Sequence, residues 1–285
     1  MSQQESAPVV RLAGVDKTFV RDGQVVTTAL SGIDLAIERG EFVSLIGPSG
    51  CGKSTLLRVI GDLIQPSAGE ISVNGKPAAR ARRDRDYGMV FQAPVLFDWR
   101  TVEDNVKLPL ELMGYDRARR DARTREMLEL VELGGFLRHH PYQLSGGMQQ
   151  RVAIARALAF EPSILLMDEP FGALDEMTRE RMNQEVLRIW ERTGITVVFV
   201  THSIPEAVFL SSRVVVMSAR PGRITDVIEI DLPRPRGVDT REKARYFELV
   251  TAVREALRGG AGDDDAVPLP GVASAARSLA EGAVG

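Results

Sequence analysis

A glycine-rich stretch, GPSGCGKS at residues 47–54, constrains the fold of this chain more than any other feature of its sequence. It follows the short apolar run FVSLI, opens the helix-forming run STLLRVIGDLI, and matches the pattern GxxxxGK[ST] in full. Glycines let the backbone curl so that successive N–H groups point at phosphate oxygens, and the helix N-terminus adds partial positive charge. A strand, a phosphate loop and a helix in this order predict a nucleotide-binding α/β fold.

Each residue of this loop is a candidate contact for a bound nucleotide. Lys53 is expected to reach the outer phosphates, and Ser54 offers a hydroxyl oxygen to Mg²⁺. Cys51 is the only cysteine, which excludes an internal disulfide. A position that needs a small side chain explains Cys51 better than a redox switch. The nucleotide-binding residues predicted here are Gly47, Pro48, Ser49, Gly50, Cys51, Gly52, Lys53, Ser54 and Thr55.

Composition narrows the class of protein. The 285 residues are 44% hydrophobic and 26% charged, with a net charge of −3, which argues against a surface built mainly for nucleic acid. A basic patch at 76–85 and another at 117–125 are interpreted as solvated faces without a ligand. The first residues, MSQQESAPVV, do not resemble a signal peptide, and apolar runs such as ITVVFV are too short to span a bilayer. We expect any membrane role to be peripheral.

The order of strand-like and helical segments predicts the domain organisation. Strand patterns dominate up to about residue 75, helical spacing dominates at about 98–160, and strands return as ILLMDEP, TVVFVTH and RVVVMSA. Short apolar strands alternating with helices predict a mainly parallel sheet covered on both faces. Residues 1–235 then form one unit with an N-terminal antiparallel β subdomain and an inserted helical subdomain.

The C-terminal part is predicted to be an appendage of this unit. Residues 236–258 are expected to form a linker and an amphipathic helix that places Phe247, Val250, Val253 and Leu257 on one face. The Gly-, Ala- and Asp-rich remainder, 259–285, is expected to be disordered.

Two carboxylates end the apolar strand ILLMDE. Ligands of open parallel sheets bind at the C-terminal ends of the strands, and adjacent strand residues point to opposite sides. Asp168 is therefore predicted to hold the Mg²⁺ shell, and Glu169 to orient and deprotonate a water that attacks the γ-phosphate.

The stretch LSGGMQQR at 144–151 adds a second glycine-opened helix start far from the phosphate loop. With the motifs above, it resembles the ATP-binding subunits of ABC transporters, over about residues 9–235. In that family the signature binds the γ-phosphate of ATP held by the other subunit, which implies that Ser145, Gly146, Gly147 and Gln149 act in trans. The helix N-terminus suits an anion. An ordinary N-cap at Ser145 is the alternative.

The same resemblance implies roles for four more residues. Gln92, in MVFQAP, is similar to the glutamine that touches Mg²⁺ and water and links the nucleotide to the helical subdomain. His202, in VFVTHS, resembles the histidine that contacts the γ-phosphate, and Asp175, in ALD, belongs to the loop that crosses the dimer interface. Phe19 stands where the family places an aromatic side chain on adenine, although tyrosine is more usual there.

The implied activity is ATP hydrolysis by a homodimer that closes on two Mg-ATP molecules and drives separate permease subunits. An extracytoplasmic solute-binding protein would be an indirect partner, no nucleic acid is expected, and the protein would sit on the cytoplasmic face of the membrane. The stretches VLFDWRTVEDNV and ARPGRI resemble the importer branch for nitrate, sulfonate, taurine and thiamine precursors, although FDW departs from the LPW common there. A soluble ABC ATPase acting on DNA or ribosomes and a P-loop nucleotide kinase are the alternatives.

Overall fold

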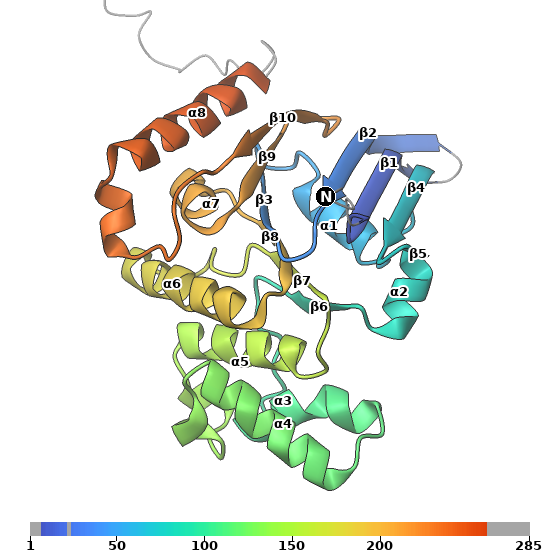
Figure 1. The fold of residues 1–285 in the computed structure, drawn as a ribbon. Coiled ribbons are helices and arrows are strands. Elements are labelled where there is room, and N and C mark those ends of the chain that lie inside the picture. The colour runs from blue at the N-terminus through green and yellow to red at the C-terminus, as the bar shows by residue number, and fades with distance from the viewer. Residues whose placement is uncertain (1–6, 22–23, 261–285) are drawn as a thin grey trace, which may run out of the picture.

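Two β-sheets and a set of helices make up the part of the chain that the computed structural model describes, residues 7–21 and 24–260 (Figure 1). The larger sheet has the strand order β10-β9-β3-β8-β7-β6, and only β10 runs antiparallel to its neighbour. Its strands are β3 (Phe42–Ile46), β6 (Tyr87–Val90), β7 (Ile164–Asp168), β8 (Thr196–Val200), β9 (Arg213–Met217) and β10 (Ile224–Glu229). The predicted mainly parallel sheet is therefore confirmed.

The smaller sheet is fully antiparallel and holds the N-terminal strands in the order β2-β1-β4-β5. Its strands are β1 (Val10–Arg21), β2 (Gln24–Ile37), β4 (Ala68–Val73) and β5 (Lys76–Pro77). Helix α1 (Lys53–Ile60) packs against β7 and β8 of the larger sheet and also contacts β2. It therefore fixes the phosphate loop, which precedes it, between the two sheets (Figure 1).

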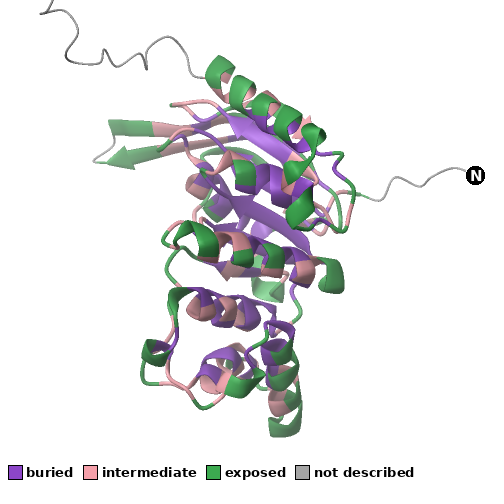
Figure 2. Ribbon diagram, turned by 90° about the vertical axis from the view of Figure 1, so that its left-hand side faces the viewer, coloured by how far each residue is buried: buried purple, intermediate pink, exposed green. Residues whose placement is uncertain are grey.

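Both faces of the larger sheet are buried, as a parallel sheet requires. Along β8, Val197 and Phe199 join the apolar cluster beneath the helices, whereas Val198 and Val200 join the cluster shared with α1 and the smaller sheet. All five residues of β8 are buried, and so are those of β3 and β7 (Figure 2). The strand ends that carry the polar residues are thus held in a rigid frame.

Three helices form the inserted subdomain, in the predicted region. They are α3 (Val102–Leu112), α4 (Arg117–Leu130) and α5 (Gly146–Leu158), with short 3-10 turns η1 (Gly134–Phe136) and η2 (Pro141–Gln143) before α5. Each helix begins at a side chain that accepts a backbone N–H, namely Thr101, Asp116 and Ser145. The remaining helical segments are α2 (Ala78–Asp84), α6 (Glu176–Thr193), α7 (Ile204–Leu210), η3 (Val238–Glu242) and α8 (Ala244–Gly260).

Helix α8 has an apolar face, but one residue that was expected on it lies elsewhere. Phe247 is 57% exposed, and the buried face is formed by Tyr246, Leu249, Val250 and Val253. The Tyr246 hydroxyl donates to the carbonyl of Pro205 at 3.0 Å, which fixes the rotation of the helix. The helix also extends to Gly260, so the disorder expected from residue 259 is wrong for its first two residues. The rest of that expectation, for 261–285, lies outside the described residues.

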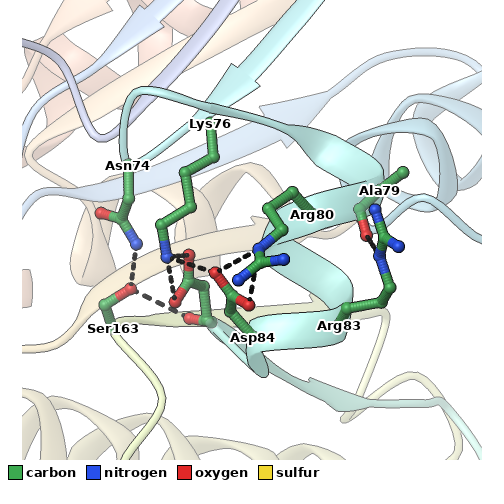
Figure 3. Close-up of polar contacts among 8 residues, drawn as sticks. Asn74, Lys76, Ala79, Arg80, Arg83, Asp84 and Ser163 are labelled. Carbon is green, nitrogen blue, oxygen red and sulfur yellow. Dashed lines mark hydrogen bonds and ion pairs between the residues drawn. The ribbon is translucent and has the colours of Figure 1, made fainter.

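The basic patch at 76–85 is balanced by nearby carboxylates (Figure 3). Lys76 Nζ lies 2.9 Å from Asp84 and 3.1 Å from Asp86, and Arg80 also pairs with Asp84, at 2.9 Å. These ion pairs raise the pKa of Lys76 and lower that of Asp84. No helix among the described residues has the length and apolar character needed to cross a bilayer.

Candidate nucleotide-binding site

A cavity of about 490 Å³ lies at the C-terminal ends of β3 and β7, where the phosphate loop and the acidic pair meet. Its lining brings together segments that are distant in the sequence: Phe19, Thr27, Ala29, Ser49, Gly50, Gly52, Lys53, Ser54, Thr55, Glu169 and Arg220. Ligands of parallel α/β sheets bind at this edge. The structure therefore collects most of the predicted phosphate-loop residues around one cavity.

The phosphate loop has a backbone that its glycines make possible. Gly50 and Gly52 have φ of 75° and 100°, in the left-handed region that glycine tolerates. A Cβ on Gly52 would stand only 2.7 Å from the carbonyl oxygen of Ala29. Lys53 is buried, and its Nζ donates to the carbonyls of Gly47 at 2.8 Å and Pro48 at 3.0 Å. Its ammonium group is thus held over the loop.

Cys51 belongs to the phosphate loop, but its side chain does not line the cavity. Its side chain is 1% exposed, and its Sγ lies 2.7 Å from the place where a Cβ on Gly47 would be. This burial is consistent with the expected preference for a small side chain at this position.

Ser54 and Asp168, two of the residues expected at Mg²⁺, are in contact. The Ser54 hydroxyl donates to Asp168 Oδ1 at 2.6 Å, and Asp168 is buried at the end of β7. A hydroxyl and a carboxylate in contact are hard oxygen donors, which fit the coordination that Mg²⁺ prefers. Gln92, the third predicted Mg²⁺ ligand, does not line the cavity. Its side chain is exposed, and its Nε2 lies 3.1 Å from the place of a Cβ on Gly172, just past β7.

Glu169 and His202 form a pair at the rim of the cavity. Glu169 Oε2 lies 3.1 Å from His202 Nδ1, and the two side chains are 27% and 56% exposed. Glu169 has φ of 45°, a conformation that non-glycine residues rarely adopt and that clusters at functional sites. Asp168 and Glu169 therefore have different partners, Ser54 and His202.

Phe19 lines the cavity from β1 and leaves part of its ring accessible. The side chain is 40% exposed, and Lys17 Nζ lies 5.1 Å from the ring centroid. Phe19 is the aromatic side chain among the described residues of the cavity lining.

The signature residues do not contribute to this cavity. Ser145 caps α5 by accepting from the Met148 N–H, and both Ser145 and Gly146 are exposed. Gly147 packs on α6, where its Cβ would lie 3.0 Å from Thr178. Gln149 is turned toward its own chain, donating to the carbonyls of Pro141 and Leu144. The helix start is therefore open to another molecule, through Ser145 and Gly146 rather than through Gln149.

Asp175 is also exposed and caps a helix. Its Oδ1 accepts from the Thr178 N–H at 3.0 Å at the start of α6. Hydrogen bonds from Thr178 lower the pKa of Asp175, so the carboxylate stays charged at neutral pH.

Two residues with functional positions were missed in the sequence. Gln150, buried in α5, donates from Nε2 to the carbonyls of Phe91 at 3.1 Å and Gln92 at 2.9 Å and to that of Pro170. Arg220 lines the cavity from the loop between β9 and β10. Gln150 stands in the motif LSGGMQQR and Arg220 in the motif ARPGRI, but neither motif indicates where the side chain points.

Comparison with known proteins identifies the family. The family model described as ABC transporter matches residues 30–172. An uncharacterized ABC transporter ATP-binding protein from Methanocaldococcus jannaschii is 48% identical and covers 85% of this chain and 89% of its own length. The chain belongs to the ABC transporter family.

Further relatives of this ABC protein are ATP-binding proteins of transporters. An aliphatic sulfonates import ATP-binding protein from Bacillus cereus is 47% identical, over 80% of this chain and 88% of the relative. A dimeric ATP-binding cassette in a post-hydrolysis state, bound to ADP and Pi, matches with a TM-score of 0.67 and 39% identity, over 80% of this chain and 99% of that chain. A cassette from Clostridium perfringens, part of the ABC transporter complex cbiONQ, matches with a TM-score of 0.72 and 26% identity, over 89% and 94% of the two chains. The chain is an ATP-hydrolysing subunit of an ABC importer.

Proposed function

We propose that two copies of this ABC protein close head to tail on two Mg-ATP molecules and thereby drive permease subunits in the membrane. The observation that carries this proposal is the position of the signature. Ser145 and Gly146 present a helix N-terminus that is exposed and lies outside the chain's own nucleotide cavity. Such a helix start favours an anion, and a second copy would bring one on its phosphate loop. The dimeric relative bound to ADP and Pi supports the formation of a dimer.

Within each site the proposed tasks follow from the contacts. Ser54 and Asp168 would hold Mg²⁺, which supplies charge neutralisation to the phosphates. Glu169 faces the cavity and acts as the general base toward water. His202 lies 3.1 Å from this carboxylate, orients it and would contact the γ-phosphate. Gln92 would join when the helical subdomain closes, because Gln150 ties its backbone to α5.

A membrane partner is supported by exposed aromatic side chains on the helical subdomain. Trp99 and Tyr142 are 75% and 70% exposed, and neither lines the nucleotide cavity. His140 brings their loops together, since its ring stacks on Tyr142 and its Nδ1 lies 3.2 Å from the carbonyl of Asp98. Large exposed aromatic groups favour a protein contact. We assign this surface to the permease and propose a peripheral position of the protein on the cytoplasmic face of the membrane.

The substrate class is proposed from the relatives. Proteins named for the import of aliphatic sulfonates are 46% to 48% identical, which supports a small organic or inorganic solute of the nitrate, sulfonate or taurine type. An extracytoplasmic solute-binding protein would deliver it. The names of these relatives favour the importer over a soluble ATPase that acts on nucleic acid or ribosomes.

The variant Glu169→Gln tests the catalytic assignment. It keeps the size of the side chain but removes the base, so ATP turnover is expected to fall by about 10² to 10⁴-fold while ATP binding persists. Size-exclusion chromatography with Mg-ATP should show a dimer. Glu176→Gln is the matched control, because Glu176 is exposed in the first turn of α6 and should leave turnover within about twofold. Near wild-type turnover of Glu169→Gln would refute the role of Glu169.

Tagged Glu169→Gln protein also tests the partner. When it is purified from detergent-solubilised native membranes with Mg-ATP, a multi-span permease should come with it in the mass spectrum. Ribosomal proteins or DNA without a permease would contradict the transport role and leave the ATPase assignment standing.

A further inference from the structure

The loop at 218–223, between β9 and β10, is a closed turn with a defined geometry. The Ser218 N–H donates to the carbonyl of Arg223 at 2.9 Å, and the Ser218 hydroxyl accepts from the Arg223 N–H at 3.1 Å. The same hydroxyl lies 3.1 Å from the carbonyl of Pro221. These contacts connect both ends of the turn, so its residues hold fixed positions relative to the sheet.

Gly222 fastens this turn to the nucleotide site. Its N–H donates to the carbonyl of Ala29 and its carbonyl accepts from the Ser31 N–H, both at 3.0 Å, so it pairs with β2 as an added strand residue. A Cβ at this position would lie 2.0 Å from the carbonyl oxygen of Cys51, inside the phosphate loop. Only glycine allows the turn to approach the loop backbone this closely.

Arg220 extends from this fastened turn alongside the phosphate loop. Its Nη2, Nε and Cζ lie 2.9, 3.5 and 3.6 Å from the place where a Cβ on Gly50 would be. The flat guanidinium therefore lies against Gly50, which has no side chain to keep it away. Arg220 is exposed and lines the cavity together with Lys53 and Glu169.

The charges around the cavity leave Arg220 available for a ligand. Lys53 and Arg220 are the cations among the described residues of the lining, and the Lys53 ammonium already donates to two loop carbonyls. The Arg220 side chain makes no hydrogen bond or ion pair with any other described residue, although it has five N–H donors to offer. A planar guanidinium is the side chain best suited to two phosphate oxygens at once.

We infer that Arg220 is a further nucleotide-binding residue, which pairs with phosphate oxygens of the ATP held by the chain's own phosphate loop. The inference deepens the proposed nucleotide site and rests on it. Arg220 contributes to ground-state binding and has no part in proton transfer, which belongs to Glu169.

Binding and turnover of ATP by Arg220→Gln test this inference. The dissociation constant for ATP, measured by isothermal titration calorimetry, should rise by about 5- to 20-fold, as expected for the loss of a charge-assisted hydrogen bond at an exposed site. KM should rise by a similar factor with kcat within about twofold, because the lost contact is made in the ground state and the transition state alike. Raising the salt concentration should weaken ATP binding by the wild type more than by this variant.

Two variants serve as controls. Arg223→Gln removes an exposed arginine from the same turn, three residues beyond Arg220 and outside the cavity lining, and should bind ATP like the wild type. Arg220→Lys keeps the charge without the planar fork and should recover part of the affinity. An ATP dissociation constant for Arg220→Gln within twofold of the wild type, or an equal loss in Arg223→Gln, would overturn the inference.

Lys53→Ala distinguishes a wrong role for Arg220 from a wrong assignment of the nucleotide-binding cavity. It removes the lysine of the phosphate loop and should abolish measurable ATP binding. Undiminished ATP binding by Lys53→Ala would mean that the cavity is misassigned, whereas loss of binding there with no effect at Arg220 would refute the role of Arg220 alone.

Discussion

At the scale of single residues, a buried carboxyl group in the helix that follows β8 and His202 bears on how the stability of the fold depends on pH. Glu206 is 5% exposed in α7, accepts a hydrogen bond from the Thr201 hydroxyl through Oε2, and leaves Oε1 without a partner among the described residues. Burial raises the pKa of Glu206, and hydrogen bonding to Thr201 and the charges of Arg179, His202 and Arg241 offset part of that rise.

The raised pKa of Glu206 predicts a direction for the pH dependence of stability. The folded state holds the Glu206 proton more tightly than the unfolded state. The stabilising contribution of this proton is therefore full below pH 4.5, the ordinary pKa of a glutamate side chain, and is lost as the pH rises through the pKa of Glu206 in the folded state. Glu206→Gln keeps the acceptor and removes the titration. We expect the melting temperature of Glu206→Gln to increase relative to that of the wild type as the pH rises from 5 to 8, as measured by thermal scans. A constant difference across this range would contradict the assignment.

Residues differ in how far sequence reasoning could place them. Ser54, Asp168 and Glu169 were predicted because a strand end and a loop fix them locally, and the sheet brings these ends together by its topology. Arg220 could not be placed in this way. Its neighbour Gly50 is 170 positions away, and the approach depends on how a turn between two strands folds onto β2.

At the scale of elements, α5 is connected to the nucleotide site by one amide. Gln150 is 2% exposed, and its Nε2 donates to carbonyls that follow β6 and β7, those of Phe91, Gln92 and Pro170. This side chain joins the helix that carries the signature to the two strand ends that carry Gln92 and Glu169. A movement of α5 therefore displaces both ends.

Replacing Gln150 by Leu should loosen this connection. The three carbonyls would lose their buried donor, which predicts a loss of about 1 to 3 kcal/mol in the free energy of unfolding measured by urea denaturation. ATP turnover should fall as well. Gln149→Leu is the control on the same helix, because the Gln149 amide donates to carbonyls of the segment just before α5, and its effect should be smaller. Equal losses for the two variants would refute the coupling.

The C-terminal elements show where a helical pattern is ambiguous. Spacings of three and four residues fit Phe247 as well as Tyr246 into one apolar face, and the sequence analysis placed Phe247 there. The choice is made by contacts with distant segments, here the Tyr246 bond to Pro205. The proline-rich segment before α8 was expected to be a linker, yet Arg236 is buried and donates to the carbonyls of Phe209 and Ser211 at the end of α7.

At the scale of the whole molecule, the chain carries two halves of a site that it does not join itself. The cavity holds the phosphate loop and Glu169, and the exposed start of α5 carries the signature on the helical subdomain. The sequence predicted both halves, because each is a local motif of glycines before a helix. How two copies meet is a property of surfaces, which a local pattern does not contain.

Mixing two inactive variants tests whether the site is shared. Lys53→Ala disables the phosphate loop, and Gly146→Asp places a carboxylate at the exposed start of α5, where it stabilises the helix but repels phosphate. Each variant alone should be inactive. In a head-to-tail dimer of one of each, one site is dead on both sides and the other is intact. Because about half of randomly formed dimers are mixed, the mixture should recover roughly a quarter of wild-type ATP turnover.

The matched control mixes Lys53→Ala with Glu169→Gln, two variants of the same cavity. Their mixed dimer has a defect in each chain's own cavity, so no turnover should return, although both proteins carry an intact signature. Turnover recovered in the first mixture and absent in the second is the result that only a shared site produces. If Gly146→Asp alone hydrolysed ATP like the wild type, each chain would have a complete site of its own, and the exposed start of α5 would be an ordinary helix cap.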